Sequence, residues 1–422
     1  MIYEDLFALW LAFLLWEFLP ANTLWEISFL YKTFLFVLKE ILFIMMPFVL
    51  KQRYFERIYL FFLYLLFSLD ITFFGFKEFF GPYYFSIFLI LLWFLHYYLW
   101  YRFLFYGFSV KYFRMLLGLF LPFFILLFLE ELLNYLGISF TGQFLFLLFG
   151  VLVFSPYFIT KIWPIEKLSD SFLRETLLKF LSKERIKIRE IYLLPSFRQK
   201  LYTAGLIGFI PPFRYLFFSK GLLEILNLEE LLGVLAHEIG HLKKKHGFYL
   251  FILILTFPLF LFNSLYLLLI PFNLIFSDLE EFMRFLEGPY GIYIEILIAL
   301  WLFLFAFLFL RFILAYFLRS FEREADLYGL ELLQTPKPLI SALYKIGEIS
   351  GQLFKSSWHH YGLWERILYL KNAAENPEII KRHSLHIRKK LIFWLILNVS
   401  LVIILNFFDF KLLNKLLKIF FH

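Results

Sequence analysis

Long runs of apolar residues alternate with short polar segments along most of this chain. The runs lie at about residues 6–19, 27–50, 59–76, 83–106, 115–136, 143–159, 248–276, 292–318 and 391–407. Most of them reach the roughly 17–25 residues that a membrane-spanning helix needs. The first run is short and contains Glu17, which favours a helix lying in the membrane interface. The pattern predicts a mainly α-helical, polytopic integral membrane protein with about eight or nine spans.

Two segments, residues 160–247 and 319–390, are polar enough to face water. Because only two spans separate them, we expect them to meet in space as one domain. The predicted organisation is therefore an N-terminal transmembrane bundle at 1–159, and a domain at 160–390 interrupted by spans at about 248–276 and 292–318. A final span and an amphipathic tail at 391–422 complete it, since lysines recur among the apolar residues after 407.

The first polar segment contains signals for both helix and strand. Apolar residues at helical spacing predict a helix over Ser171–Ser182, and the patterns at 186–194 and 202–210 predict two strands in a small β-hairpin or sheet. Asn227 followed three residues later by Glu230 is typical of a capping box. We therefore expect a helix to begin directly after Asn227.

That helix carries the sequence His237-Glu238-Ile239-Gly240-His241. Positions i and i+4 of a helix share a face, so His237 and His241 can present two imidazoles to one metal ion. Glu238 lies on the adjoining surface, where its carboxylate can act as a general base toward water. Catalytic zinc needs a third protein ligand and one open position.

The third ligand is expected in the segment Arg319–Asp326, which follows the eighth apolar run. The chain returns there to the side of the membrane that carries the histidines. Glu322 is the best candidate, and Glu324 competes with it on chemistry alone. Asp326, one helical turn after Glu322, can accept a hydrogen bond from the free ring nitrogen of a metal-bound histidine.

The composition supports a membrane environment and excludes any chemistry that needs cysteine. The chain is 62% hydrophobic and 24% aromatic, and its mean hydropathy is +0.77. Soluble globular proteins are about half apolar, so the excess must face lipid. With no cysteine in the sequence, disulfides, thiolate metal ligands and a cysteine nucleophile are excluded.

The net charge of +8 is concentrated beside the apolar runs. Basic residues mark the segments 51–57, 102–114, 160–247 and 319–390, whereas the loop at 277–291 is acidic. Nine crossings would place every basic segment on one side, which the positive-inside rule identifies as cytoplasmic. The helix with the two histidines lies on that side. Membrane orientation therefore explains the charge better than nucleic-acid binding does, and no nucleic-acid partner is expected.

The His-Glu-Ile-Gly-His helix, the two-span excursion and the segment Phe321–Asp326 together resemble the membrane-embedded HExxH zinc metalloproteases of metallopeptidase family 48. This family includes the type 1 CAAX prenyl proteases and the heat-shock membrane proteases of the HtpX type. The resemblance covers roughly residues 155–375. In the family pattern the ligand Glu is followed by Ala and Asp at +3 and +4. Only Glu322, with Ala325 and Asp326, fits that pattern.

The resemblance implies a gluzincin-like domain holding one Zn²⁺ per chain through His237, His241 and Glu322, with Glu238 as general base. Relatives also carry a His six residues before an Arg, which falls on His360 and Arg366. The role implied for His360 is to stabilise the oxyanion of the tetrahedral intermediate. His359 is the alternative if the alignment with the family pattern shifts by one residue.

A substrate is expected to add as an extra strand beside the active site. The residues that would receive it are Tyr202, Thr203, Ala204 and Gly205. Two departures from the family bear on how the substrate is aligned. Thr203-Ala204 stands where relatives usually have Asn-Ala, and His360-Tyr361-Gly362 stands where they often have His-Pro-Pro.

These observations predict a zinc metalloendopeptidase that cleaves membrane-associated or lipid-modified polypeptides, similar to a CAAX prenyl protease. The expected partners are a peptide or protein substrate and membrane lipid. The expected location is a bacterial plasma membrane with the active site on the cytoplasmic side. A heat-shock-type quality-control protease of misfolded membrane proteins is the alternative within the family.

Two readings outside the family are less well supported. An intramembrane protease of the site-2 type would place an aspartate ligand in an LDG-like motif, and this sequence has none. A silent scaffold or transporter with a structural metal would fill all four metal positions with protein ligands. His246 is the nearest spare histidine, and on a continuous helix it would point away from His241 at about 100° per residue.

Overall fold

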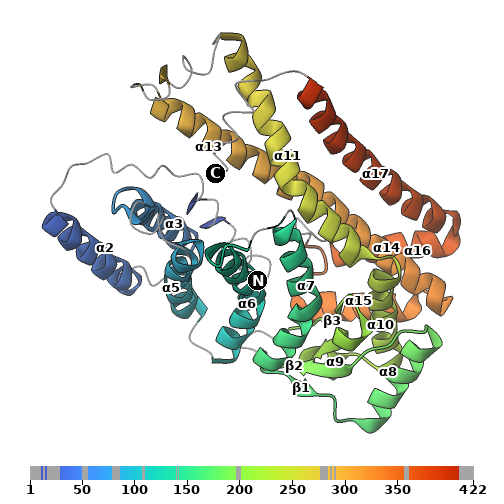
Figure 1. Ribbon diagram of the computed structural model, residues 1–422. Coiled ribbons are helices and arrows are strands. Elements are labelled where there is room, and N and C mark those ends of the chain that lie inside the picture. The colour runs from blue at the N-terminus through green and yellow to red at the C-terminus, as the bar shows by residue number, and fades with distance from the viewer. Residues whose placement is uncertain are drawn as a thin grey trace. The chain divides into compact units, whose positions relative to one another are not determined.

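The computed structural model describes most of the 422 residues. The described residues are 11–12, 15–16, 29–49, 56–77, 86–106, 110–138, 140, 142–195, 201–275, 284–285, 288, 291–355 and 361–407. They divide into two compact units, Met1–Ile165 and Glu166–His422. Figure 1 shows both units, coloured along the chain.

The first unit is built from apolar helices. They are α2 (Phe29–Val49), α3 (Glu56–Thr72), α5 (Ser86–Tyr106), α6 (Val110–Tyr135) and α7 (Gln143–Ile162). In α3, Tyr59, Leu63 and Phe67 recur every four residues and are almost completely buried, so they form one packed stripe. This stripe packs with Phe94 and Tyr97 of α5 in a core rich in aromatic residues.

A polar cluster lies inside this apolar core. Lys39 of α2 forms an ion pair and hydrogen bond with Asp70 of α3, and Asp70 is fully buried. Tyr97 and Trp93 of α5 lie 2.6 Å and 2.9 Å from the Asp70 Oδ2 atom and donate to it. Charged groups are expensive to bury in an apolar core unless they are paired. The cluster therefore ties α2, α3 and α5 together through groups that satisfy one another.

The second unit contains a four-stranded sheet in the order β1-β2-β4-β3. The strands are β1 (Glu166–Lys167), β2 (Glu190–Leu194), β3 (Ala204–Ile207) and β4 (Tyr215–Ser219). β2 and β4 run parallel, and the other two pairs are antiparallel. The two predicted strands correspond to β2 and β3, whereas β1 and β4 were not predicted. Every residue of β4 is buried, so the alternation of apolar and polar residues that reveals a half-exposed strand is missing there.

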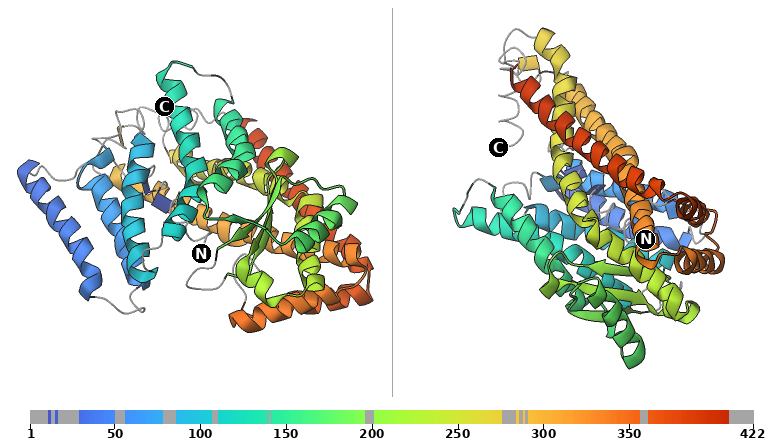
Figure 2. Two further views of the ribbon diagram at one scale, coloured as in Figure 1. Left: turned by 90° about the horizontal axis from the view of Figure 1, so that it is seen from below. Right: turned by 90° about the vertical axis from the view of Figure 1, so that its right-hand side faces the viewer.

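Helices surround the sheet and extend from it. They are α8 (Ser171–Lys183), α9 (Lys220–Ile225), α10 (Leu228–Lys243), α11 (His246–Ile275), α13 (Gly291–Leu308), α14 (Ala315–Leu333), α15 (Lys337–Ser350), α16 (Leu363–Glu375) and α17 (Glu378–Phe407). A π-helical turn at Phe309–Leu314 joins α13 to α14, and a 3₁₀ turn at Pro211–Phe213 precedes β4. Figures 1 and 2 show α11, α13 and α17 running together away from the sheet.

Helix α10 occupies the middle of this unit. It begins with the predicted capping box, in which Asn227 and Glu230 exchange side-chain-to-backbone hydrogen bonds of 2.9 Å. Its apolar residues Leu231, Leu235 and Ile239 are buried against the sheet and α8. The opposite side of α10 packs against α14 and α15. This packing places the motif helix between two others from the C-terminal part of the chain.

Among the described residues, four helices are long and apolar enough to cross a membrane. They are Phe113–Tyr135, Gln143–Ile162, His246–Leu268 and Ile296–Leu333. Two shorter apolar helices lie at Ile58–Thr72 and Leu89–Tyr101. The chain is thus a mainly helical integral membrane protein with a small sheet, and the count of eight or nine spans stays a prediction. Most of the first apolar run and the amphipathic tail after 407 lie outside the described residues.

Candidate metal centre

The two motif histidines lie on one face of α10. Their Nε2 atoms are 3.2 Å apart, as expected for residues one helical turn apart. His237 is buried, and the His241 side chain is 29% exposed. Glu238 follows His237 directly and is half-buried. Both imidazoles therefore turn the same ring nitrogen toward one point, and a carboxylate stands beside them.

Glu322 of α14 completes a group of three. One carboxylate oxygen lies 3.8 Å from the His237 Nε2 atom, and the other lies 3.5 Å from the His241 Nε2 atom. The three ligand atoms all lie within 4.8 Å of one another. Zinc bonds of about 2.0–2.1 Å at tetrahedral angles require ligand atoms about 3.3 Å apart. The two nitrogens and the carboxylate thus fit a zinc ion with small side-chain adjustments.

Close packing of two helices brings Glu322 to the histidines. A Cβ atom on Gly240 would lie 2.9 Å from the Cα atom of Ala325, which is closer than such atoms pack. Gly240 belongs to the histidine motif, and Ala325 follows Glu322 by three residues. Both positions therefore hold residues with little or no side chain, because α10 and α14 touch there backbone to backbone.

Asp326 lies behind His237, as the sequence predicts. Its Oδ1 atom is 2.8 Å from the His237 Nδ1 atom, and Arg366 of α16 donates two hydrogen bonds to the same carboxylate, at 2.8 Å and 2.6 Å. Burial acts to lower the pKa of Arg366, but the carboxylates of Asp326 and Glu322 outweigh it and raise the pKa above its usual value. The guanidinium is therefore always charged.

Arg366 also contacts the metal cluster directly. Its Nη1 atom lies 3.1 Å from a Glu322 carboxylate oxygen. One guanidinium thus holds the carboxylates of both Glu322 and Asp326. Because the two carboxylates lie on the same helix, one turn apart, Arg366 fixes the face that α14 presents to α10.

Glu324, the competing ligand candidate, does not point into the cluster. Its side chain is buried, and its Oε2 atom lies 3.0 Å from the His246 Nε2 atom. Among the described residues, the group able to hold a metal consists of His237, His241 and Glu322. The structure therefore distinguishes two glutamates that the sequence chemistry left equivalent.

The expectation that His246 points away from His241 is wrong. The two Nδ1 atoms lie 2.9 Å apart. The expectation assumed a continuous helix, but α10 ends at Lys243 and α11 begins at His246. Between them Lys245 adopts a left-handed conformation with φ of 60°, which interrupts the helix and leaves the His246 ring next to that of His241. A lysine at this position gives no sequence signal for such a break, because glycine is the usual residue there.

The residue implied as oxyanion stabiliser, His360, and its alternative His359 lie outside the described residues. Their roles therefore stay predictions. Arg366, six residues after His360, is placed as described above. Tyr361 is the first described residue after the gap, and the Arg323 guanidinium of α14 stacks 3.5 Å from the centre of its ring.

The predicted substrate strand lies at an edge of the sheet. β3 begins at Ala204 and includes Gly205, and it pairs with β4. Thr203 exchanges hydrogen bonds with Ser219 at the end of β4, which extends the pairing by one residue. In the described part of the chain, no strand pairs with the other side of β3. β3 and α10 are in contact, so this free edge lies next to the helix that carries the histidines.

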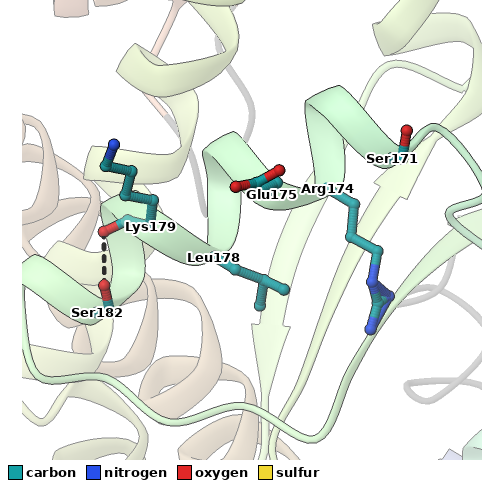
Figure 3. Close-up of a pocket in the computed structure, with 6 residues that line it drawn as sticks. All are labelled: Ser171, Arg174, Glu175, Leu178, Lys179 and Ser182. Atoms are coloured by element: carbon teal, nitrogen blue, oxygen red, sulfur yellow. Dashed lines mark hydrogen bonds between the residues drawn. The ribbon is translucent and has the colours of Figure 1, made fainter.

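A surface pocket of about 640 Å³ lies on α8 and is separate from the metal centre. Its lining residues are Ser171, Arg174, Glu175, Leu178, Lys179 and Ser182, and Figure 3 shows them along one side of that helix. None of them belongs to the metal cluster, and none is a residue that the sequence singles out for chemistry.

Comparisons with known proteins identify the region around the cluster. Residues 198–383 match the family model of peptidase family M48. A CAAX prenyl protease 1 homolog of Oryza sativa subsp. japonica is 25% identical over 239 residues, which is 54% of this chain and 52% of that protein. A protease HtpX homolog of Desulfatibacillum aliphaticivorans is 28% identical over 174 residues, 41% of this chain and 52% of that protein.

The chain spans about half the length of the curated relatives that it matches. Among solved structures, the crystal structure of S. mikatae Ste24p aligns with a TM-score of 0.42 and 18% identity, covering 87% of this chain and 96% of that chain. The family match contains His237, His241, Glu322 and Arg366. The region that brings these side chains together thus lies within the match to peptidase family M48.

Proposed function

We propose that this chain is an integral-membrane, zinc-dependent endopeptidase. The observation that carries the proposal is the convergence of His237, His241 and Glu322 at separations that suit tetrahedral zinc, with Glu238 beside them. Three protein ligands leave one position open, which is the arrangement of a catalytic site. The match of this region to a peptidase family supports the same conclusion.

Zinc bound by these residues would lower the pKa of water towards neutrality and polarise the scissile carbonyl. Glu238 takes a proton from the attacking water and returns it to the leaving amine. Its half-buried position allows the carboxylate to reach both water and substrate. Asp326 accepts a hydrogen bond from the Nδ1–H group of His237. The unprotonated Nε2 atom of His237 is then free to bind the metal.

We assign the stabilisation of the oxyanion to His360, following the family pattern in which a histidine precedes Arg366 by six residues. A donor aimed at a developing oxyanion contributes several kcal/mol of transition-state stabilisation in comparable enzymes, roughly 3. Replacing His360 should therefore lower kcat strongly and leave zinc binding unchanged.

The substrate would bind in extended form along the free edge of β3, at Tyr202–Gly205. Main-chain hydrogen bonds would hold it, as in other cases of strand addition. Such binding depends little on side chains. Cleavage sites across a peptide library should accordingly show weak sequence preference, and a strict preference would contradict this mode of binding.

We propose membrane-associated or lipid-modified polypeptides as substrates, in the manner of a CAAX prenyl protease. The apolar helices of the same chain would hold the active site at a membrane surface, where such substrates are concentrated. The similarity to a protease HtpX homolog supports misfolded membrane proteins as the second candidate. The charge distribution supports an active site on the cytoplasmic side. We propose a bacterial plasma membrane as the location.

Cleavage by purified protein in detergent tests the proposal. Wild type is compared with Glu238→Gln on two substrates, a prenylated CAAX peptide and an unfolded membrane protein, and bound zinc is quantified in both proteins. We expect cleavage by wild type, none by Glu238→Gln, and equal zinc content. The preferred substrate chooses between the two candidates.

Two outcomes would count against the proposal. Folded wild-type protein without zinc affinity would exclude the metal site. Equal zinc binding with no cleavage of either substrate would count against both proposed substrate classes and leave a silent scaffold, or an enzyme that acts on another substrate.

A further inference from the structure

Behind His241, two buried side chains form a hydrogen-bonded chain. The His241 Nδ1 atom lies 2.9 Å from the His246 Nδ1 atom, and the His246 Nε2 atom lies 3.0 Å from the Glu324 Oε2 atom. His246 and Glu324 are each only 3% exposed. Buried polar groups at these distances are hydrogen-bonded, so the arrangement of protons along the chain can be worked out.

Metal binding determines which atom donates in each of these hydrogen bonds. The Nε2 atom of His241 faces His237 and Glu322, and a ligating nitrogen must carry no proton. The proton of the neutral imidazole is then on Nδ1, which donates to His246. The Nδ1 atom of His246 accepts, so its own proton is on Nε2, which donates to Glu324. Each nitrogen thus has one role, and the chain ends on a carboxylate.

We propose that His246 and Glu324 are positioning residues that hold His241 as a metal ligand. They correspond in purpose to Asp326, which contacts the other histidine directly. A carboxylate behind a metal-bound histidine orients the ring and makes its ligating nitrogen more basic. Here an intervening imidazole transmits the influence of Glu324. This inference rests on the proposed metal site.

The local fold holds His246 in the orientation that the hydrogen bonds to His241 and Glu324 require. The left-handed Lys245 ends α10 and turns the next residue back toward His241. The His246 ring then stacks on Phe321, with ring centres 4.6 Å apart and an angle of 16° between planes. Phe321 is itself buried. One backbone turn and one aromatic contact therefore set both the position and the plane of the imidazole.

Zinc affinity, measured by competition with a chelator on the full chain in detergent, tests the inference. His246→Phe keeps a ring that can stack on Phe321 and removes both hydrogen bonds. We expect zinc affinity to fall roughly 10–100-fold, as for other residues behind metal ligands. His246→Asn places an amide oxygen where it can accept from His241, and we expect it to recover most of that affinity. The absorption spectrum of the Co²⁺-substituted protein should change in His246→Phe and return in His246→Asn.

His383→Phe is the matched control. His383 is also a partly buried histidine with two hydrogen bonds, to the Tyr369 hydroxyl and to the Ser320 carbonyl, both at 3.1 Å, and neither of these bonds is to a metal ligand. We expect this variant to lower thermal stability and leave zinc affinity and the Co²⁺ spectrum unchanged. An equal loss of affinity in His383→Phe would show a general structural effect and overturn the inference.

Folded His246→Phe protein with wild-type zinc affinity would also overturn it. If His246→Phe does not fold, Glu324→Gln is the variant that tests the inference. Glutamine keeps the size of the side chain and an acceptor for His246 but removes the negative charge of Glu324. We then expect a several-fold loss of affinity, and unchanged affinity would contradict the proposal. Wild-type protein that binds no zinc would refute the proposed function itself, so the two failures are distinguishable.

Discussion

At the scale of single residues, the polar groups of this protein act in pairs and chains that span different elements. Asp326 links His237 to Arg366, and Glu230 links the start of α10 to α15. The sequence indicates the first of these groups through spacing, because Asp326 lies one helical turn after Glu322. It does not indicate which distant residue completes each pair, since that depends on how the helices pack.

Glu230 provides a prediction of pH dependence. Its carboxylate accepts hydrogen bonds from Ser341 and Lys345 of α15, at 2.6 Å and 2.8 Å, and from the Asn227 backbone. Burial acts to raise the pKa of Glu230, but these hydrogen bonds and the charge of Lys345 outweigh it and lower the pKa below the ordinary value of 4.5. The folded state therefore gains stability from Glu230 above about pH 4.5, and loses it as pH falls through the lowered pKa.

Glu230→Gln should accordingly be less stable than wild type at pH 7, and the difference should shrink as pH falls below 4.5. Thermal unfolding of both proteins in detergent across this range measures the effect. A stability difference that is the same at all these pH values would show that the carboxylate charge contributes nothing.

Asp70 provides a second prediction, in the N-terminal unit. Asp70→Leu would remove the fully buried partner of Lys39, whose ammonium is only 8% exposed and would keep its ion pair with Glu40 at 2.8 Å. Removing one member of a buried ion pair costs up to about 3–5 kcal/mol of unfolding free energy, and the remaining pair with Glu40 should keep the loss toward the lower end. The double variant Lys39→Met with Asp70→Leu removes both charges and should recover a large part of that loss. Equilibrium unfolding in detergent measures both, and a double variant no more stable than the single one would contradict this account.

At the scale of elements, the candidate site depends on the contact between α10 and α14. His237 and His241 come from the first helix, and Glu322 comes from the second. The glycine and alanine in the two motifs are explained by this contact, because the backbones approach closely at Gly240 and Ala325. The residues between the chemically active positions therefore set the distance between the ligands.

Gly240→Ala tests this explanation. The added methyl group would lie 2.9 Å from the Ala325 backbone and force α10 and α14 apart. We expect a loss of about 1–3 kcal/mol in unfolding free energy from overpacking, together with weaker zinc binding because Glu322 moves away from the histidines. Gly233→Ala is the control, since its methyl group would meet the Leu339 backbone of α15 at 2.8 Å, on the same helix but at a different contact.

The control variant should lose comparable stability and retain wild-type zinc affinity. Thermal unfolding and chelator competition on both variants measure the two effects separately. If both variants lose zinc affinity equally, the helix spacing at Gly240 has no special role in forming the metal cluster.

At the scale of the whole molecule, the metal would join parts of the chain that lie far apart in the sequence. The apolar helices α11 and α13 separate the histidines from Glu322. A bound ion would therefore stabilise the packing of α10 against α14 in addition to supplying chemistry. Ligands that bind only the folded state raise its stability in proportion to the logarithm of their concentration.

Zinc removal should consequently lower the unfolding temperature of the wild type. At a zinc concentration 100-fold above Kd, the expected stabilisation is about 2.7 kcal/mol. Glu322→Ala lacks one ligand and should show a much smaller difference between zinc-loaded and chelator-treated samples. Differential scanning fluorimetry in detergent measures the shift, and identical unfolding of the wild type with and without zinc would contradict a metal bound at this cluster.

Local patterns were sufficient to predict part of this protein from its sequence. The apolar runs indicate a helical membrane protein, the capping box locates the start of α10, and the i, i+4 histidines define a metal-binding face. Each of these depends only on residues of one continuous segment, where the periodicity of the backbone fixes which side chains are neighbours.

Tertiary structure alone decided the rest. It turned Glu324 toward His246 and away from the cluster, although Glu324 lies on the same helix as Glu322, which the family pattern already favoured as the ligand. It also brought His246 back to His241 through the left-handed turn at Lys245, and it completed the sheet with the fully buried β4. These features depend on which helix faces pack together and where a helix breaks. Such choices are governed by contacts between distant segments, which no local pattern in the sequence records.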